Sequence, residues 1–278
     1  MNVSDLMRIF YFNRLAARVF TQDPDGWLIK GGQALLVRYR GAARLSGDRD
    51  LQAAHPDLTP DEARKRVLEA AACALNDFLR FAPGKCTSAA DPARGGSQHF
   101  QVFLGPTRVD SVKVDITVRR SLAGTPEISP LASAGDLPWP VDWPTVRLRL
   151  YPLIDHIADK ICALYERHGD GTSSRYRDLA DLLLISQQEE VNGRAVYQDL
   201  HREADQRCQR SIDLTLPKSF EAPGPAWHDN YPAAAALVIG LQGCGTFPEA
   251  AQAAETFLNP LLDGSAQGHW NPANASWQ

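Results

Sequence analysis

The stretch that decides the fold reads Lys30-Gly31-Gly32-Gln33-Ala34-Leu35, followed by Arg44-Leu45-Ser46-Gly47-Asp48-Arg49-Asp50-Leu51. A glycine pair provides flexible backbone that can approach a phosphate group closely. Asp48 and Asp50 stand two residues apart, so on a strand their side chains project to the same side. Two neighbouring carboxylates repel each other unless a cation lies between them. The stretch therefore predicts a site for a metal ion and a nucleotide.

A later segment supplies a third carboxylate. The run Val112-Lys113-Val114-Asp115-Ile116-Thr117-Val118 alternates between apolar and polar residues, which predicts a strand with one buried face. Asp115 lies on the polar face. If this strand lies near the strand of Asp48 and Asp50, three carboxylates meet on one surface. Such a group suits two divalent metal ions that assist an in-line phosphoryl displacement, and Mg²⁺ is the expected ion.

The second half of the chain adds two motifs that complete a resemblance to a known family. They read Tyr151-Pro152-Leu153-Ile154-Asp155-His156-Ile157-Ala158-Asp159-Lys160-Ile161-Cys162-Ala163-Leu164 and Ser174-Arg175-Tyr176-Arg177-Asp178-Leu179-Ala180-Asp181-Leu182. With the glycine pair, the Ser-x-Asp-x-Asp motif and the single Asp115, they resemble the AbiEii family of nucleotidyltransferase toxins, which includes the mycobacterial MenT-type toxins. The resemblance covers roughly residues 27 to 185.

The resemblance implies a fold and a division of the chain. The fold class is α/β (α+β), a nucleotidyltransferase-like mixed sheet with flanking helices and a helical C-terminal half. We expect residues 1–145 to form the catalytic domain and residues 146–278 to form a helical domain that completes the active-site cleft.

The resemblance also implies roles for individual residues. The expected metal ligands are Asp48, Asp50 and Asp115. The expected nucleotide-binding residues are Gly31, Gly32, Arg44, Ser46 and Lys160. Lys160 and Asp178 join the three metal ligands as catalytic residues. Two positions depart from the family pattern, because Gln33 replaces a small hydroxyl residue and Arg49 replaces an aliphatic one. Strand alternation directs Arg49 away from both aspartates, so the metal site should survive.

Helical periodicity independently selects Lys160. In a helix over 153–167, Lys160 falls at the edge of an apolar stripe, where an amine needs an anion or must reach solvent. That anion is a nucleotide phosphate or, alternatively, Asp178. On the next helix Asp178 lies near the inner face, whereas Asp181 is turned further toward solvent, so Asp178 is the preferred functional carboxylate.

At several other positions an ordinary structural role competes with a functional one. Ser46 is either a phosphate contact or a cap or loop hydroxyl, and Arg44 is a candidate phosphate ligand. Arg175 and Arg177 fit a solvated face, although Arg175 lies toward the inner side and could order Asp178. Two histidines, His156 and His168, are expected to be surface or structural residues rather than metal ligands.

Composition sets further bounds. The 278 residues include 33 acidic and 29 basic ones, a net charge of −4 that does not by itself indicate nucleic-acid binding. The five cysteines are scattered without a CxxC pair, which argues against a disulfide framework or a zinc site and fits a reducing cytoplasm. The sequence contains no apolar run of about 18 residues, so no membrane span is expected.

Local patterns predict the elements of the chain. Thr59-Pro60-Asp61-Glu62 is a helix start with a capping box, and that helix is expected to end near Leu79. Residues 83–98 are expected to form a loop, and residues 99–104 to pair with 112–118 around Gly105-Pro106. The other expectations are helices over 4–20 and 33–40, a strand over 27–29, an irregular crossover over 121–144, mainly helices from 153 onward, and a mobile tail over 264–278.

These observations predict nucleotidyl transfer from an NTP, with release of pyrophosphate. By resemblance, the acceptor is the 3′ end of a tRNA, and the modification blocks translation. The protein would then be a growth-inhibiting toxin controlled by a cognate antitoxin. Two alternatives remain open at this level. One is nucleotidyl transfer to a protein or small-molecule hydroxyl, and the other is a non-catalytic nucleotide-binding regulator.

Overall fold

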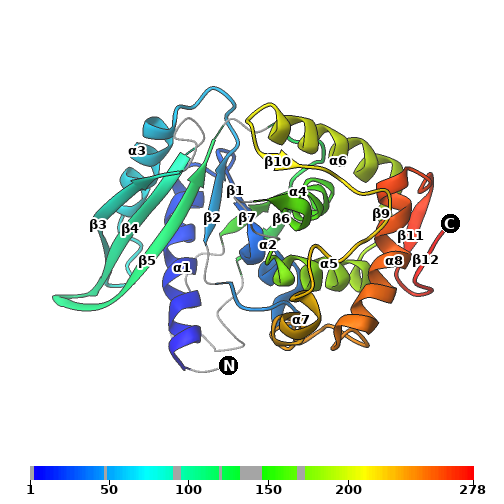
Figure 1. The fold of residues 1–278 in the computed structure, drawn as a ribbon. Helices are drawn as coiled ribbons and strands as arrows, with labels where there is room; N and C mark the ends of the chain where they lie inside the picture. Colours follow the sequence, from blue (N-terminus) through cyan, green and yellow to red (C-terminus); the bar gives the residue numbers. More distant parts are fainter. Residues whose placement is uncertain (1–2, 47–48, 90–94, 119–120, 132–145, 168–172) are drawn as a thin grey trace. The chain divides into compact units, whose positions relative to one another are not determined.

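The structure is a computed structural model that describes residues 3–46, 49–89, 95–118, 121–131, 146–167 and 173–278. The chain forms two compact units. The strand-bearing unit contains residues 1–38, 45–121 and 126–151, and the helical unit contains residues 39–44, 122–125 and 152–278. Their elements are shown in Figure 1. In the described part of the chain, no helix is both long enough and apolar enough to cross a membrane.

The strand-bearing unit is built on a mixed seven-stranded sheet with the order β3-β4-β5-β2-β1-β7-β6. The β2–β5 and β1–β7 pairs are parallel, and the remaining pairs are antiparallel. The strands are β1 Trp27–Lys30, β2 Asp50–Ala53, β3 Leu79–Ser88, β4 Gly95–Leu104, β5 Thr107–Thr117, β6 Glu127–Pro130 and β7 Arg147–Leu150. The predicted α/β class with a mixed sheet is confirmed.

Two helices pack together against this sheet. α1 spans Val3–Gln22 and contacts β5, and α3 spans Pro60–Ala71 and contacts β3, β4 and β5. The alternation of β5 explains the packing, because Val112, Val114 and Ile116 are buried in the same apolar core as side chains from both helices. The opposite face of β5 is left for Lys113, Asp115 and Thr117. α2, Gly31–Tyr39, begins directly after β1.

The N-terminus of α3 matches its sequence signature. Thr59 is the N-cap, its hydroxyl accepts from the backbone N–H of Glu62, and the Glu62 carboxylate accepts from the backbone N–H of Thr59. The predicted C-terminus was wrong, because the helix ends at Ala71 rather than near Leu79. The chain between α3 and β3 is not helical, with positive φ angles at Asn76 and Phe78. Asp77 accepts hydrogen bonds from Arg18 and Arg14 of α1, and the backbone enters β3 at Leu79.

Two other local expectations were also wrong. Most of 83–98 is strand rather than loop, because Pro83 and Gly84 form an irregularity within the β3–β4 pairing and do not end it. The tail is not a mobile segment, since it contributes β11, His269–Asn271, and β12, Ser276–Trp277. Trp277 stacks on Phe257 at 5.8 Å between ring centroids, which gives the tail an aromatic core contact.

The helical unit consists mainly of helices around a second buried core. α4 contacts both α5 and α6, and α8 contacts α5, α6 and α7. The helices are α4 Leu153–Tyr165, α5 Tyr176–Gln188, α6 Gly193–Cys208, α7 Trp227–Ala235 and α8 Phe247–Asp263. The short strands are β8 Glu166–Arg167 with β10 Asp213–Leu214, and β9 Val191–Asn192 with β11 and β12. A short 3₁₀ helix at Arg40–Ala42 also belongs to this unit.

Candidate active site

A single register row crosses the sheet of the strand-bearing unit and carries polar side chains. Lys30 on β1 pairs with Asp50 on β2, Asp50 pairs with Asp115 on β5, and Asp115 pairs with Ser97 on β4. Residues directly opposite each other on neighbouring strands project to the same face, and the strands lie about 4.8 Å apart. The two carboxylates of Asp50 and Asp115 therefore lie side by side.

Asp48 lies outside the described residues, so the structure does not place it. Ser46, two residues earlier, is half-buried. Arg49, between the two motif aspartates, turns to the other side of β2, as strand alternation predicts. Its guanidinium carbon lies 5.8 Å from the centre of the Phe12 ring, and its Nη2 donates to the backbone carbonyl of Arg8. The arginine thus contacts α1 and leaves the face of Asp50 unobstructed.

The helix expected over 33–40 begins earlier, at the glycine pair Gly31 and Gly32. They are the first residues of α2. Gly31 has a φ of +62°, and a Cβ added to it would lie 2.1 Å from Oδ2 of Asp50. Only glycine accommodates both the conformation and the contact. The positive end of the α2 dipole is therefore placed next to the Asp50 carboxylate.

Asp115 is held by two donors. The Ser97 hydroxyl donates to Oδ1, and Nζ of Lys113 lies 3.0 Å from Oδ2. The Asp115 side chain retains 28% of its exposure, so it is accessible for ligand binding. Ser97 and Lys30 are members of the row that sequence reasoning missed. Extending the alternation of 99–104 backward would have placed Ser97 on the polar face.

The chemistry of these donors fits a hard divalent cation. Two carboxylates side by side on one face supply oxygen ligands of the kind that Mg²⁺ prefers. Asp48 would be the third ligand. Among the described residues, which exclude Asp48, no cluster of three or more metal-ligating side chains is present.

The helical unit contains a second charged cluster, centred on Lys160 of α4. Its Nζ lies 2.6 Å from Oδ1 of Asp178 and 2.7 Å from Oδ2 of Asp181, both on α5. Lys160 is 5% exposed. Burial by itself would lower the pKa of Lys160, but the charges of Asp178 and Asp181 outweigh it and raise the pKa above its ordinary value. Lys160 is therefore a buried cation held by two carboxylates.

The expectation that Asp181 turns toward solvent was wrong. Asp181 is fully buried and binds Arg44 in a bidentate pair, with Nε–Oδ1 at 3.0 Å and Nη2–Oδ2 at 2.9 Å. Helical periodicity predicted the wrong environment for Asp181 because α5 packs against α4, α7 and α8, so more than one face of α5 is buried. Asp181 is the charged residue of this cluster that sequence reasoning missed.

The structure also gives the surroundings of the other arginine and histidine candidates. Arg175 and Arg177 are exposed, and Arg175 makes only a 3.9 Å contact with Asp178. His156 is buried within α4, which fits a structural role, and His168 lies outside the described residues. The Arg44 guanidinium pairs with Asp181, and its role as a phosphate ligand stays a prediction.

Comparison with known proteins gives a family and a fold. A family model described as "Nucleotidyl transferase AbiEii toxin, Type IV TA system" matches residues 14–267. A search of curated proteins finds no match. Among solved structures, the nucleotidyltransferase toxin MenT4 of Mycobacterium tuberculosis is similar at 16% identity and a TM-score of 0.50, covering 94% of this chain and 92% of that chain.

Two further structures share lower similarity. A protein from H. pylori assigned to the nucleotidyltransferases has 16% identity and a TM-score of 0.42, with 86% of this chain and 96% of that chain covered. An antigenic nucleotidyltransferase-like protein from Paracoccidioides brasiliensis has 15% identity and a TM-score of 0.40, with 76% of this chain and 92% of that chain covered.

Proposed function

Because the chain belongs to the AbiEii family of nucleotidyltransferase toxins, we propose that it transfers a nucleotidyl group from an NTP to the 3′ end of a tRNA. Pyrophosphate is released, and the modified tRNA can no longer be aminoacylated. The family is that of a type IV toxin–antitoxin system, which implies an antitoxin as partner. The expected cofactor is Mg²⁺, with two ions bound.

The observation that carries the proposal is the register of Asp50 and Asp115 on neighbouring parallel strands. With Asp48, they would hold the metal ions and the NTP phosphates on one face of the sheet. Bound Mg²⁺ would neutralise the charge that develops on the phosphoryl oxygens and on the leaving pyrophosphate. Gly31 leaves the space beside Asp50 that a side chain would fill.

The reaction is a displacement at the α-phosphorus. The acceptor hydroxyl oxygen forms a bond to this phosphorus, and the bond to the β-phosphate bridging oxygen breaks. The hydroxyl proton passes to a carboxylate oxygen of Asp115, and pyrophosphate departs. Catalysis then consists mainly of positioning and charge stabilisation, because the protein forms no covalent bond to the substrate.

Lys160 would bind phosphate oxygens of the NTP. Its two carboxylate partners differ in accessibility, since the side chain of Asp178 is 14% exposed and that of Asp181 is 1% exposed. Asp178 is therefore the partner that a phosphate would replace or join. Asp181 remains bound to Arg44 and keeps the ammonium group in place.

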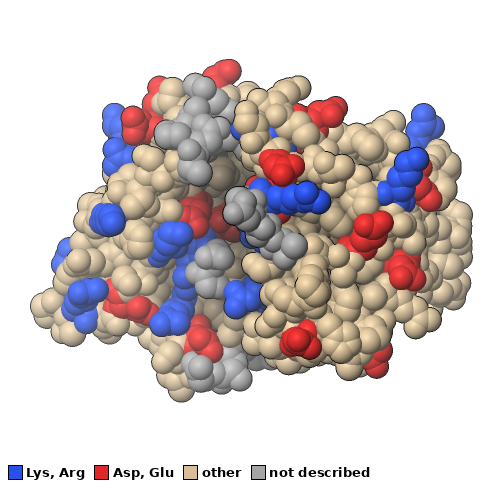
Figure 2. Space-filling view, viewed as in Figure 1, with Lys and Arg blue, Asp and Glu red and all other residues tan. Residues whose placement is uncertain are grey.

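The charge distribution supports contact with one end of an RNA rather than with its whole length. Basic and acidic side chains are interspersed on the visible face of the molecule (Figure 2), and the net charge is −4. Arg38 is bound to Glu127 of its own unit at 2.9 Å, and Arg44 is bound to Asp181. Arginines of the helical unit that are exposed, and so can contact phosphates, include Arg40, Arg167, Arg175, Arg177 and Arg194.

The proposal is tested by incubating the purified protein with total RNA and each α-labelled NTP. We expect label at the 3′ end of tRNA, released by nuclease but not by protease. Asp115→Asn, which keeps the side-chain size, should give no label. Label released only by protease would contradict the tRNA assignment and favour transfer to a protein. NTP binding without any transfer would favour a non-catalytic regulator.

A cellular experiment tests the toxin assignment separately. Expression without the antitoxin should arrest growth, and expression of Asp48→Ala should not. Growth arrest by a folded Asp48→Ala protein would contradict a mechanism based on nucleotidyl transfer.

A further inference from the structure

Two side chains, Ser97 and Lys113, donate hydrogen bonds to the carboxylate of Asp115. Ser97 approaches it from β4, on the side away from β2, and donates its hydroxyl hydrogen to Oδ1. Lys113 approaches from two residues earlier on β5 and contacts Oδ2. The two donors differ in setting, because Lys113 is a partly solvated cation with a side-chain exposure of 45%, whereas Ser97 sits within the sheet.

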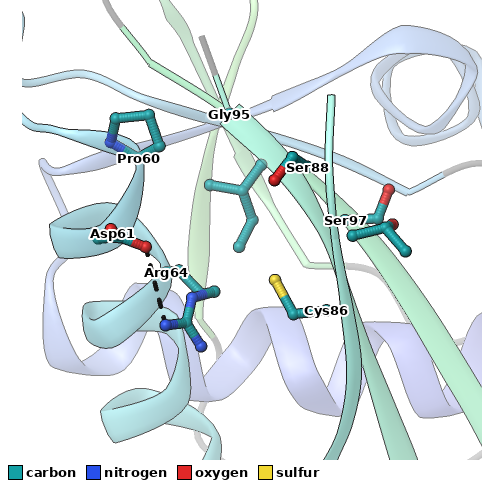
Figure 3. A pocket seen from close by; sticks show the side chains of 10 residues that line it. Pro60, Asp61, Arg64, Cys86, Ser88, Gly95 and Ser97 are labelled. Carbon is teal, nitrogen blue, oxygen red and sulfur yellow. Dashed lines mark ion pairs between the residues drawn. The ribbon is translucent and has the colours of Figure 1, made fainter. Parts of the chain in front are cut away.

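The position of Ser97 is set by two glycines that open β4. A Cβ on Gly95 would lie 1.8 Å from the carbonyl oxygen of Ile116, and a Cβ on Gly96 would lie 2.5 Å from the carbonyl oxygen of Thr87. The start of β4 is thus pressed against both neighbouring strands. The glycines also line a cavity of about 220 Å³ between α3 and the β3–β4 pair (Figure 3). Side chains at these positions would displace the backbone that carries Ser97.

The orientation of Asp115 needs such a donor. Its neighbour in the row is Asp50, and two carboxylates on adjacent strands repel each other unless a cation lies between them. A hydrogen bond to Oδ1 from the β4 side fixes the rotation of the carboxylate, commits Oδ1 to Ser97 and leaves Oδ2 as the oxygen for a cation shared with Asp50. It is a charge-assisted bond, which is stronger than one between neutral groups.

We propose that Ser97 is a positioning residue for Asp115 and sets the divalent-cation affinity of the site. Its hydroxyl holds Oδ1 on the β4 side and so fixes the rotation at which Oδ2 is left for the cation. Ser97 is not itself a ligand and does not contact the NTP. This inference rests on the proposed function, because it gives Asp115 the role of a metal ligand.

The hydroxyl is not required for the pairing of β4 with β5, which is made by the backbone over ten register positions. A purely structural role therefore predicts no change in cation binding when the hydroxyl is lost. A positioning role predicts a loss of cation affinity of about 10- to 100-fold, which is typical when a group that orients a metal ligand is removed.

The experiment measures Mn²⁺ binding to the full chain by calorimetry, in the presence of a non-hydrolysable NTP analogue. Ser97→Ala should bind Mn²⁺ about 10- to 100-fold more weakly than the wild type. Ser97→Thr, which keeps the hydroxyl, should bind Mn²⁺ with an affinity close to that of the wild type. Ser111→Ala, an exposed serine of β5, is the matched control and should bind like the wild type. Melting temperatures are recorded for all variants.

The outcomes separate this inference from the proposed function. Wild-type Mn²⁺ affinity in folded Ser97→Ala overturns the inference, provided that Asp115→Asn has lost binding. Wild-type affinity in Asp115→Asn overturns the metal site and the proposed function with it. If Ser97→Ala does not fold, Ser97→Cys replaces it, because a thiol has a similar shape but is a weak donor. Wild-type affinity in that variant overturns the inference equally.

Discussion

Gly31 and Asp50 are in such close contact that a single added carbon atom on Gly31 would lie 2.1 Å from Oδ2 of Asp50. The glycine is the first residue of α2 and has a φ of +62°, whereas the aspartate is the first residue of β2. The pairing of β1 with β2 brings the two elements together, since Lys30 lies opposite Asp50. The glycine pair and the Ser-x-Asp-x-Asp motif, which are separate in the sequence, are therefore in direct contact in the fold.

This contact predicts the effect of Gly31→Ala. The alanine should destabilise the protein by about 1–3 kcal/mol, because a left-handed conformation is strained for any residue with a Cβ. It should also displace the Asp50 carboxylate and reduce transfer strongly. Gly41→Ala is the control, since a Cβ there meets nothing within 4 Å. Urea unfolding and a transfer assay check both effects, and normal transfer in folded Gly31→Ala would contradict the role of the contact.

The buried cluster predicts the effect of Lys160→Met. Removing the ammonium group leaves Asp178 and Asp181 with one fewer cation in a buried site. Loss of one partner from a buried ion pair costs about 3–5 kcal/mol of unfolding free energy. Arg175→Ala is the control, because its contact with Asp178 is 3.9 Å long and its side chain is 56% exposed, so the loss should be below about 1 kcal/mol. Chemical denaturation measures both, and equal stability of Lys160→Met and wild type would rule out a closed cluster.

Asp77 predicts a dependence of stability on pH. Burial by itself would raise the pKa of Asp77, but hydrogen bonds from Arg18 and Arg14 outweigh it and hold the pKa below its ordinary value of 3.8. A carboxyl group with a lowered pKa stabilises the fold above its unfolded value, and this stability is lost as the pH falls through the folded value. We therefore expect the contribution of Asp77 to be present at pH 5 to 8, roughly the usual range of maximal stability, and to disappear well below pH 4.

The measurement is the urea midpoint at neutral pH and near pH 3. Asp77→Asn should lower the midpoint at neutral pH and flatten its acid dependence. Asp61→Asn, whose carboxylate is 94% exposed, should change neither. An unchanged acid dependence in Asp77→Asn would show that other carboxylates are responsible.

The exposed arginines predict the salt dependence of tRNA modification. Arg175 and Arg177 are exposed on the first turn of the helical motif, where they can contact phosphates. Each phosphate contact contributes about −0.9 to the slope of log affinity against log salt. Arg175→Ala and Arg177→Ala should each weaken tRNA binding and reduce the steepness of that slope by about 1. Arg64→Ala in the strand-bearing unit is the control, and an unchanged slope in both variants would place the RNA elsewhere.

The start of α3 and the buried face of β5 were predicted from interactions between residues close together in the sequence. Thr59, Pro60 and Glu62 specify a helix start through hydrogen bonds within one turn, and the structure contains that start. The alternation of Val112, Val114 and Ile116 specifies which side of β5 is buried, so the direction of Asp115 followed from it. Both signals depend only on neighbours within a few residues.

Other features depend on partners far away in the sequence. The segment between α3 and β3 is held by the pair of Asp77 with Arg18, 59 residues earlier. Asp181 can be buried because its carboxylate is paired with the positive charges of Lys160 and of Arg44, which lies 137 residues earlier. No periodicity within α5 could reveal either partner.

The sequence by itself determined the mixed α/β class, the family motifs and the residue types of the candidate site, because these follow from spacing and local hydrogen bonding. Only the tertiary structure decided that Asp50 and Asp115 are direct register neighbours, that Ser97 holds Asp115, and that Asp181 belongs to the Lys160 cluster. Strand order, register and helix packing bring together side chains that are distant in the chain, and burial then selects which charges must be paired.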